Sequence, residues 1–382
     1  MTIIDPAAYN RIEQRYKLQM PIVIRQALNL EVFEKFGFPI KVDSIVDLRL
    51  FLNTMQDGRF KQYFDELGGI TQSDNKLFLE ALKKHLELQK KYFPNDELIV
   101  PLDIMMSGLL IAKKLHYFVP DITRILEIGP GVGQTSFFLS SYVNNLKSVC
   151  FVEACQSFYI LQSLTFDHVY GESFKEHGHD SEHIKFNHLW KDLSINEYSH
   201  ETTITNLNFN NCSIHHYPYF KFPEIKNSDN HKYDLIMANA CLNEISIAAL
   251  NIYLDGIKRD LISEGGYLFY QCPGLNHDGR NIVKILNDHG FNPMFISSGN
   301  HNFDLTNSKF SWKSPTPTGL FKFTGKPISL SDENTLKLSC GHATYILPEI
   351  VSVLERIQRD TLNNISFEKF CLNINNEFNI LI

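Results

Sequence analysis

Hydrophobic residues follow a helical period in the first part of the chain. In residues 73–94, for example, Phe78 and Leu82 fall on one face at the spacing of an amphipathic helix. Residues 104–115 are apolar nearly all round, which is typical of a helix packed on a sheet. Because no alternating strand pattern competes, residues 1–118 are predicted to be all-helical.

Capping residues mark the expected starts of two of these helices. Asp5 is a good N-cap, and Pro6 follows it at the first helical position, where proline is tolerated. Ser73 or Asp74 is the expected cap of the long helix that follows.

From Thr123 onward, continuous apolar strands alternate with helices. This order predicts a parallel sheet covered by helices on both faces. The parallel strands are expected at 124–129, 148–153, 211–217, 233–239 and 267–272. Two later strands, 293–297 and 320–324, look like an antiparallel hairpin that closes the sheet. The tail beyond about residue 330 carries one clear amphipathic helix, with Pro348 near its start.

Composition narrows the class of protein. The chain has 382 residues, 43% of them hydrophobic, which indicates a globular protein with a large core. A net charge of −7 argues against broad binding to nucleic acid. The seven cysteines form no C-x-x-C pair and are expected to be reduced, which favours a cytoplasmic location. No apolar run approaches the ~20 residues that span a bilayer, so we expect no membrane segment.

A polar, histidine-rich segment interrupts the alternation, and an insertion is expected near residues 168–205. Within it, His177, His179 and His183 have the donor atoms of a metal site. A solvated loop explains the same residues more simply, so we predict no metal.

A glycine-rich loop follows the first expected strand directly. Its glycines, Gly129, Gly131 and Gly133, have the spacing G-x-G-x-G, and a helical pattern begins at once. Glycine allows the backbone to turn sharply and to approach a ligand closely. Glu127 lies two residues before the first glycine, and a second acid, Glu153, ends the next apolar run.

This loop departs from the dinucleotide-binding pattern G-x-G-x-x-G. Gln134 stands where the third glycine would fall, and Gly133 comes one position early. Glu127 would also be an unfavourable neighbour for a pyrophosphate seated on a helix N-terminus. A tight turn in some other α/β fold is the remaining structural alternative.

The pattern E-x-G-x-G-x-G resembles motif I of class I S-adenosylmethionine (SAM) methyltransferases. This resemblance implies a Rossmann-like sheet of seven strands, the last antiparallel, over residues 119–328, with residues 1–118 as a helical lid and a helical C-terminal extension over 329–382. It also implies that the loop wraps the methionine and ribose of SAM, with Glu127 beside the ammonium group and Glu153 on both ribose hydroxyls. The implied cofactor-binding residues are Glu127, Gly129, Gly131, Gly133, Gln134, Glu153 and Asn239.

The segment after the fourth strand resembles the N-x-x-S-x-x-E-M segment of a sugar O-methyltransferase family. Asn239 and Glu244 correspond to its asparagine and glutamate. The match is partial, because Leu242 or Cys241 takes the serine position and Ile245 the methionine position. This resemblance implies methyl transfer to a hydroxyl of a small polar acceptor, with a sugar or sugar-bearing metabolite first.

The segment after the fourth strand also bears on other activities of the same fold. It lacks the [DN]-P-P-[YFW] motif of amino methyltransferases that act on nucleic acid, and Cys272-Pro273 reverses the Pro-Cys order of cytosine-C5 enzymes. A methyltransferase for a non-sugar natural product or a nitrogen acceptor stays an alternative. So does a SAM-binding protein without turnover.

Three residues are candidates for the base that takes the acceptor proton: Glu244, His277 and His216. Each also has a structural explanation. Glu244 suits a helix N-terminus, where an acid interacts well with the helix dipole. His277 suits a solvated loop, and His216, in a strand beside His215, suits either the site or the core.

Overall fold

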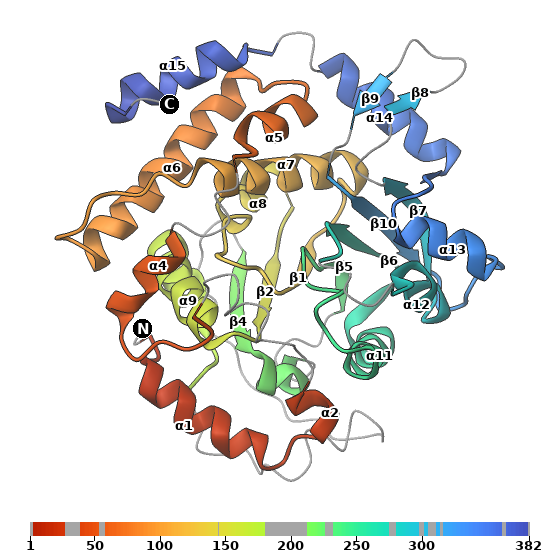
Figure 1. Cartoon of the computed structure of the whole chain (residues 1–382), viewed down its shortest axis with the longest axis horizontal. Helices are drawn as coiled ribbons and strands as arrows, with labels where there is room; N and C mark the ends of the chain where they lie inside the picture. Colours follow the sequence, from red (N-terminus) through yellow and green to blue (C-terminus); the bar gives the residue numbers. More distant parts are fainter. Residues whose placement is uncertain are drawn as a thin grey trace.

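The computed structural model describes residues 3–26, 39–52, 58–143, 145–179, 212–225, 232–274, 280–297, 302–304, 311–313, 316–360 and 364–380. In these ranges a central sheet is surrounded by helices (Figure 1). No helix in them combines the length and the apolar character needed to cross a membrane.

The sheet contains nine strands of the described ranges, in the order β11-β7-β10-β6-β5-β1-β2-β4-β3. Six neighbouring strands of this order, β6, β5, β1, β2, β4 and β3, run parallel to one another. By contrast, β10 is antiparallel to β6 and β7, and β11 is antiparallel to β7. The strands are β1 (Arg124–Ile128), β2 (Ser148–Glu153), β3 (Phe174–Glu176), β4 (Ser213–Pro218), β5 (Tyr233–Met237), β6 (Ile262–Gln271), β7 (Phe291–Ser297), β10 (Thr318–Phe323) and β11 (Tyr345–Ile346). A separate antiparallel ribbon pairs β8 (Asn302–Asp304) with β9 (Ser311–Lys313).

The predicted Rossmann-like α/β sheet, closed by antiparallel pairing, is confirmed. The expected number of seven strands is wrong, because β3 and β11 extend the sheet at its two edges. These strands have three and two residues, too few for an alternating pattern to be visible in the sequence.

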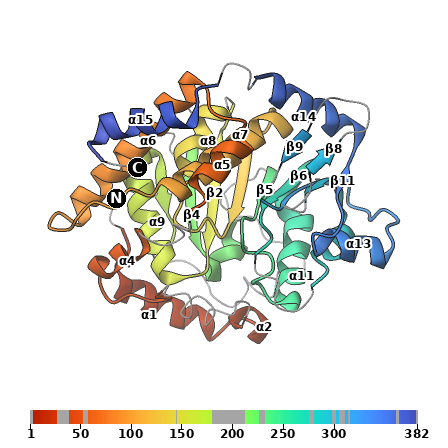
Figure 2. The same ribbon diagram turned by 45° about the horizontal axis from the view of Figure 1, so that its top comes forward.

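Helices cover both faces of the sheet, so its strands are buried on both sides. Ile125 of β1 lies in one apolar cluster with α7 and α8, and Leu126, the next residue, lies in another with α11 and α12. Figure 2, which turns the top of the molecule forward, shows α7 across the upper end of the strands. The bounds are α7 (Leu102–Phe118), α8 (Ser136–Tyr142), α9 (Gln156–Tyr170), α11 (Ile247–Gly256) and α12 (Ile282–Asp288).

The first helices begin at capping residues. Asp5 caps α1 as predicted, because its Oδ1 accepts from the backbone N–H of Ala8 at 2.7 Å. The cap of α6 is Thr71 rather than Ser73 or Asp74: Thr71 Oγ1 accepts from the Asp74 N–H at 3.1 Å, and Asp74 Oδ2 accepts from the Thr71 N–H at 2.9 Å. These helices are α1 (Pro6–Lys17), α2 (Ile22–Arg25), α4 (Arg49–Leu52), α5 (Phe60–Glu66) and α6 (Gln72–Tyr92).

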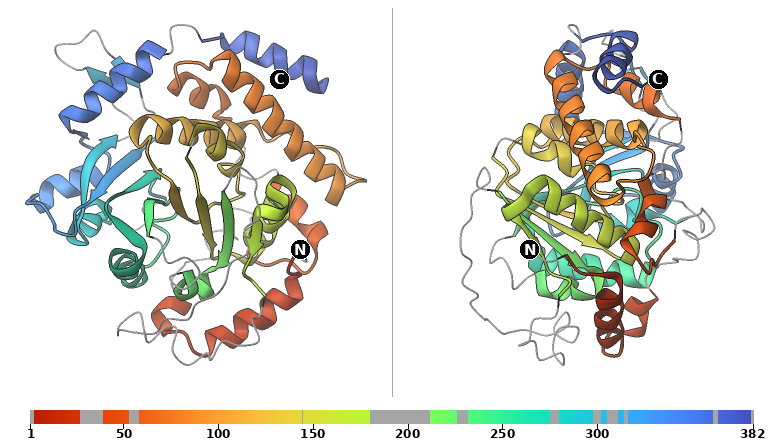
Figure 3. Two further views of the ribbon diagram at one scale, coloured as in Figure 1. Left: turned by 180° about the vertical axis from the view of Figure 1, so that it is seen from behind. Right: turned by 90° about the vertical axis from the view of Figure 1, so that its left-hand side faces the viewer.

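The C-terminal extension returns to the N-terminal helices (Figures 1 and 3). Phe370 of α15 is buried against Phe60, Phe64 and Phe78, with ring centroids 5.0–5.6 Å apart. The tail holds more than the one helix that was predicted, namely α13 (Asp332–Ser339), α14 (Pro348–Asp360) and α15 (Phe367–Phe378).

Candidate functional site

The glycine loop turns sharply at the carboxyl end of β1. Gly129, Gly131 and Gly133 have φ angles of +64°, +62° and +79°. Residues that carry a Cβ rarely adopt such positive φ angles. Space is also limited, since a Cβ on Gly129 would lie 3.1 Å from Cys241 Cβ, and one on Gly133 would lie 3.1 Å from a ring carbon of Phe166. The loop therefore needs glycine for both conformation and packing.

Glu127 lies inside β1 with 1% of its surface exposed. Its Oε1 accepts a hydrogen bond from Asn239 Nδ2 at 3.2 Å, and Asn239 Oδ1 in turn accepts from the Gln271 N–H at 2.9 Å. Oε2 of Glu127 is buried and has no hydrogen-bond partner among the described residues. Burial raises the pKa of Glu127 to about 7. This carboxyl group thus has an open acceptor position inside the protein.

Glu153 ends β2 and is held by several N–H groups. Its Oε1 accepts from the backbone of Ala154 and Cys155 at 2.8 and 2.9 Å, where α9 begins. Its Oε2 accepts from Gln162 Nε2 at 2.8 Å. Burial raises the pKa of Glu153 to about 7, although these hydrogen bonds oppose the shift. The carboxyl group is therefore fixed in direction.

Helix α7 of the N-terminal region contacts the glycine loop directly. A Cβ on Gly108 would lie 3.1 Å from the carbonyl carbon and oxygen of Gln134, so the two backbones approach closely. Gln134 itself is buried, and its Oε1 has no partner within the described ranges.

The loops after β5 and β6 are joined by backbone hydrogen bonds. The Ala240 N–H donates to the Cys272 carbonyl at 2.8 Å, and the Asn243 N–H donates to the Pro273 carbonyl at 2.7 Å. Ala240 and Cys272 have φ angles of +54° and +64°, which are unusual for residues other than glycine. Such backbone conformations concentrate at functional sites, where surrounding contacts hold them.

Glu244 lies in this same group of residues. Burial, followed by the charge of Glu153, raises the pKa of Glu244 to about 7. Burial also raises the pKa of the Cys241 thiol, and the charges of Glu244, Glu153 and Glu127 add to that effect. The charges of three predicted acids therefore act on Cys241. Among the described residues none of these acids forms an ion pair with Lys, Arg or His.

His216, the third candidate base, lies in the core and not at an open surface. It is 0% exposed, and its ring stacks on Tyr159 with centroids 4.0 Å apart. Nδ1 lies 3.0 Å from Ser163 Oγ, and Nε2 lies 2.8 Å from Gln162 Oε1. Burial holds the pKa of His216 well below its usual range. With both nitrogens engaged, this ring cannot itself take a proton from an acceptor.

The remaining histidine predictions are only partly covered by the structure. His277 and His183 lie outside the described residues. His177 Nε2 lies 3.0 Å from His215 Nδ1, and His179 Nε2 lies 3.0 Å from Glu176 Oε2. In the described ranges these side chains form no group of three or more metal ligands.

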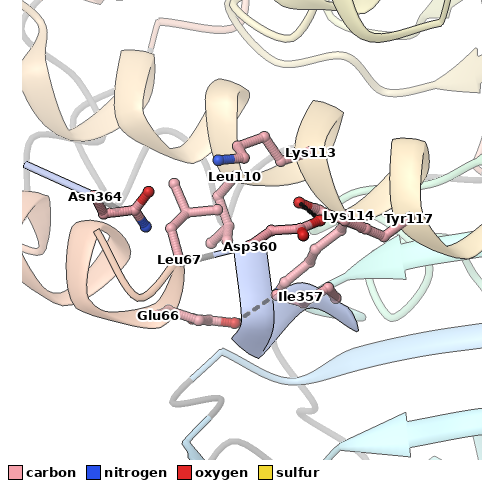
Figure 4. A pocket seen from close by; sticks show the side chains of 9 residues that line it. All are labelled: Glu66, Leu67, Leu110, Lys113, Lys114, Tyr117, Ile357, Asp360 and Asn364. Atoms are coloured by element: carbon pink, nitrogen blue, oxygen red, sulfur yellow. Dashed lines mark hydrogen bonds and ion pairs between the residues drawn. The ribbon is translucent and has the colours of Figure 1, made fainter. Parts of the chain in front are cut away.

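A buried lysine that the sequence analysis did not identify connects α7 to the sheet. Lys114 Nζ is within 3.0 Å of Thr318 Oγ1 and 3.2 Å of Gln271 Oε1, and it pairs with Glu66 Oε1 at 2.5 Å. It lines a cavity of about 20 Å³ whose other walls include residues of α5, α7 and α14 (Figure 4). The backbone N–H of Gln271 also donates to Asn239, and Asn239 donates to Glu127. Gln271 and Asn239 therefore connect Lys114 to Glu127. A lysine within the apolar stretch 104–115 was the available signal.

No family model and no curated protein matches the chain. Solved structures similar to it include the O-methyltransferase TomG from Streptomyces achromogenes, at 13% identity over 71% of this chain and 100% of that one, with a TM-score of 0.35. A methyltransferase from Pyrococcus furiosus has 13% identity over 64% of this chain and 97% of that one, with a TM-score of 0.33. An amino pentose methyltransferase, CalS10 from Micromonospora echinaspora, has 12% identity and a TM-score of 0.25. The match covers 44% of this chain and about half, 49%, of that one.

Proposed function

We propose that this protein is a SAM-dependent methyltransferase acting on a hydroxyl of a small polar acceptor, with sugars and sugar-bearing metabolites as first candidates. The observation that carries the proposal is the pair of buried acids Glu127 and Glu153 at the glycine loop, with Glu244, which is half-buried, close enough for the charge of Glu153 to act on it. Buried acids without a cationic partner suit a cationic ligand. SAM has a sulfonium, an ammonium and a ribose diol, and it has no phosphate.

The individual residues fit such a ligand. Oε2 of Glu127 is a buried acceptor with no partner in the described part of the chain, as an ammonium site requires. Glu153, fixed by its N–H donors, suits the ribose hydroxyls. Gly131, in its left-handed conformation, allows the backbone to approach the ligand.

Bound SAM would supply a methyl group on a sulfonium, which is a good leaving group. The protein then has to align the acceptor oxygen and remove its proton. Glu244 suits the second task, because a pKa of about 7 leaves a large share of the carboxylate ionised at neutral pH. The strained backbones of Ala240 and Cys272 belong to the two loops that follow β5 and β6, the first of which carries Glu244, and these loops suit the first task.

The choice of a sugar hydroxyl rests on the segment from Asn239 to Glu244 and its resemblance to the sugar O-methyltransferase family. Its two matching residues have distinct surroundings. Asn239 binds Glu127, and the Glu244 carboxyl group has no hydrogen bond to another described residue. The first therefore suits the cofactor side, and the second suits the acceptor side.

Two measurements test the proposal. Calorimetry should detect SAM binding to the natural protein and none to Gly131→Arg, with circular dichroism confirming that the variant folds; equal affinity would refute the site. A panel of glycosides and their aglycones should then give S-adenosylhomocysteine with the glycosides. Transfer only to aglycones or amines would refute the sugar assignment, and binding without turnover on any acceptor would favour a non-catalytic SAM-binding protein.

A further inference from the structure

Gln162 of α9 connects two parts of the site that bind the cofactor in the proposed function, namely Glu153 and the glycine loop. Its Nε2 donates to Glu153 Oε2 at 2.8 Å and also to the carbonyl oxygen of Gly131. Its Oε1 faces His216 Nε2 at 2.8 Å. The side chain is 0% exposed, so water does not compete for these hydrogen bonds.

The hydrogen bonds around Gln162 have only one consistent direction. The Gly131 carbonyl can only accept, so the amide nitrogen of Gln162 must lie on this side, and its second N–H then points at Glu153 Oε2. The amide oxygen of Gln162 must then accept, and His216 must carry its proton on Nε2. His216 Nδ1 is left as an acceptor for the hydroxyl of Ser163, 3.0 Å away.

The packing around His216 keeps this arrangement in place. The ring stacks on Tyr159 at 4.0 Å and meets Phe166 edge-on at 5.1 Å. A neutral ring has one N–H to donate, and burial favours the neutral form. The ring therefore has neither room to rotate nor a second proton with which to reverse the direction of the bonds.

We propose that His216 and Gln162 are positioning residues, which turn the Glu153 carboxyl group toward the ribose and hold the Gly131 carbonyl in the loop. The proposal rests on the proposed function, since it assigns ribose to Glu153. Two N–H groups already occupy Oε1 of Glu153, and Gln162 occupies one side of Oε2. Three of the roughly four acceptor positions of the carboxylate are thus filled, and the position that remains, on Oε2, is the one left for a ribose hydroxyl. Strand β4 thereby acts on the ends of β1 and β2 without touching the ligand.

The test compares S-adenosylhomocysteine with its 2′-deoxy analogue by calorimetry. The natural protein should bind the analogue more weakly. In Gln162→Met, affinity for S-adenosylhomocysteine should fall about tenfold, the size expected for a lost hydrogen bond to a charged group. The ratio of the two affinities, S-adenosylhomocysteine over the 2′-deoxy analogue, measures the preference for the ribose hydroxyl and should fall toward one. A general loss of protein stability would weaken the binding of both ligands equally and leave the ratio of their affinities unchanged.

Conservative variants separate positioning from packing. Glutamine at 216 retains an N–H near the place of Nε2, so His216→Gln should keep the preference, whereas His216→Asn should lose it as Gln162→Met does. Ser163→Ala, a smaller change, should reduce the preference about threefold. Thr165→Ala is the control, because Thr165 is also buried in α9, but among the described residues its hydroxyl binds only the Leu161 carbonyl.

The outcomes distinguish the two proposals. If the natural protein fails to bind S-adenosylhomocysteine, both the proposed function and this inference are wrong. If it binds, and folded Gln162→Met or Ser163→Ala keeps the full preference for the ribose hydroxyl, only the positioning role is wrong.

Discussion

Individual carboxyl groups are the central residues of the proposed site. Glu127 and Glu153 are nearly fully buried, and burial raises the pKa of each to about 7, against an ordinary value of 4.5. A group with a raised pKa favours folding below its ordinary pKa, and this contribution is lost as the pH rises through the raised value. At neutral pH the site is therefore only partly ionised, and a cationic ligand would complete its ionisation.

Cofactor binding should consequently depend on pH. Because the cation favours the ionised carboxylates, affinity for SAM should rise from pH 5.5 to about 8, by about tenfold per pH unit for each carboxylate that must lose its proton. Calorimetry in buffers of different ionisation enthalpy should show proton release on binding near pH 7. Glu127→Gln should bind more weakly and with a shallower pH dependence. A flat profile in the natural protein would contradict the role given to these acids.

Glu244 should affect turnover more than cofactor binding. The substitution Glu244→Gln removes the base and with it proton transfer, which is worth about 10²- to 10⁴-fold in rate. We expect this variant to lower kcat by that factor, while S-adenosylhomocysteine affinity changes less than threefold. Glu244→Asp should retain more activity and keep an acidic limb in the pH–rate profile. Equal activity of all three proteins would exclude Glu244 as the base.

At the scale of helices and strands, the features that depend on local sequence pattern could be predicted from the sequence. The strands that carry Glu127 and Glu153 were predicted, because each is a continuous apolar run that leads into a glycine loop or ends at an acid. The cap of α6 was misplaced by two or three residues, since Thr71 and Asp74 share the capping.

Features that depend on register between distant elements were not predictable. His216 was a plausible base from its place in a strand, but the packing of α9 over β4 decides that it binds Gln162 and Ser163. Lys114 likewise finds partners on α5, β6 and β10, which lie far away in the chain.

Lys114 should be essential for docking α5 and α7 on the sheet. Its side chain is 4% exposed and that of Glu66 is 0% exposed, so Lys114→Met leaves a buried carboxyl group without its ammonium partner. We expect a loss of about 3–5 kcal/mol in the free energy of unfolding, measured by urea denaturation. The double variant with Glu66→Leu should recover most of this loss. If the double variant is as unstable as the single one, the ion pair is not the cause.

At the scale of the whole molecule, the C-terminal extension packs against the helices of the N-terminal region. Besides the aromatic contacts of Phe370, the Ile365 N–H donates to the Ile70 carbonyl at 2.9 Å, and Asn364 Nδ2 donates to the Gly68 carbonyl at 2.8 Å. Tyr117 of α7 also binds Asp360 of α14 at 2.9 Å. The C-terminal extension thus packs against α5, α6 and α7, and α7 is the helix that contacts the glycine loop.

Phe370→Ala should measure this contribution. Removing a fully buried aromatic ring costs about 3–5 kcal/mol, so the melting temperature should fall by several degrees. At a temperature where the variant is folded, affinity for S-adenosylhomocysteine should stay within twofold of the natural value. Leu372→Ala, on the exposed side of α15, is the matched control and should change neither quantity. A large loss of affinity in folded Phe370→Ala would show that α15 affects the site directly.

The backbone bonds between the loops after β5 and β6 have a consequence for protein engineering. Because Ala240 binds Cys272 and Asn243 binds Pro273, the two loops hold each other in their unusual conformations. Grafting one of them from a different protein would break that mutual support. Exchanging both as a single cassette, residues 239–245 together with 272–274, keeps it, and this is the unit in which a library aimed at new acceptors should be built.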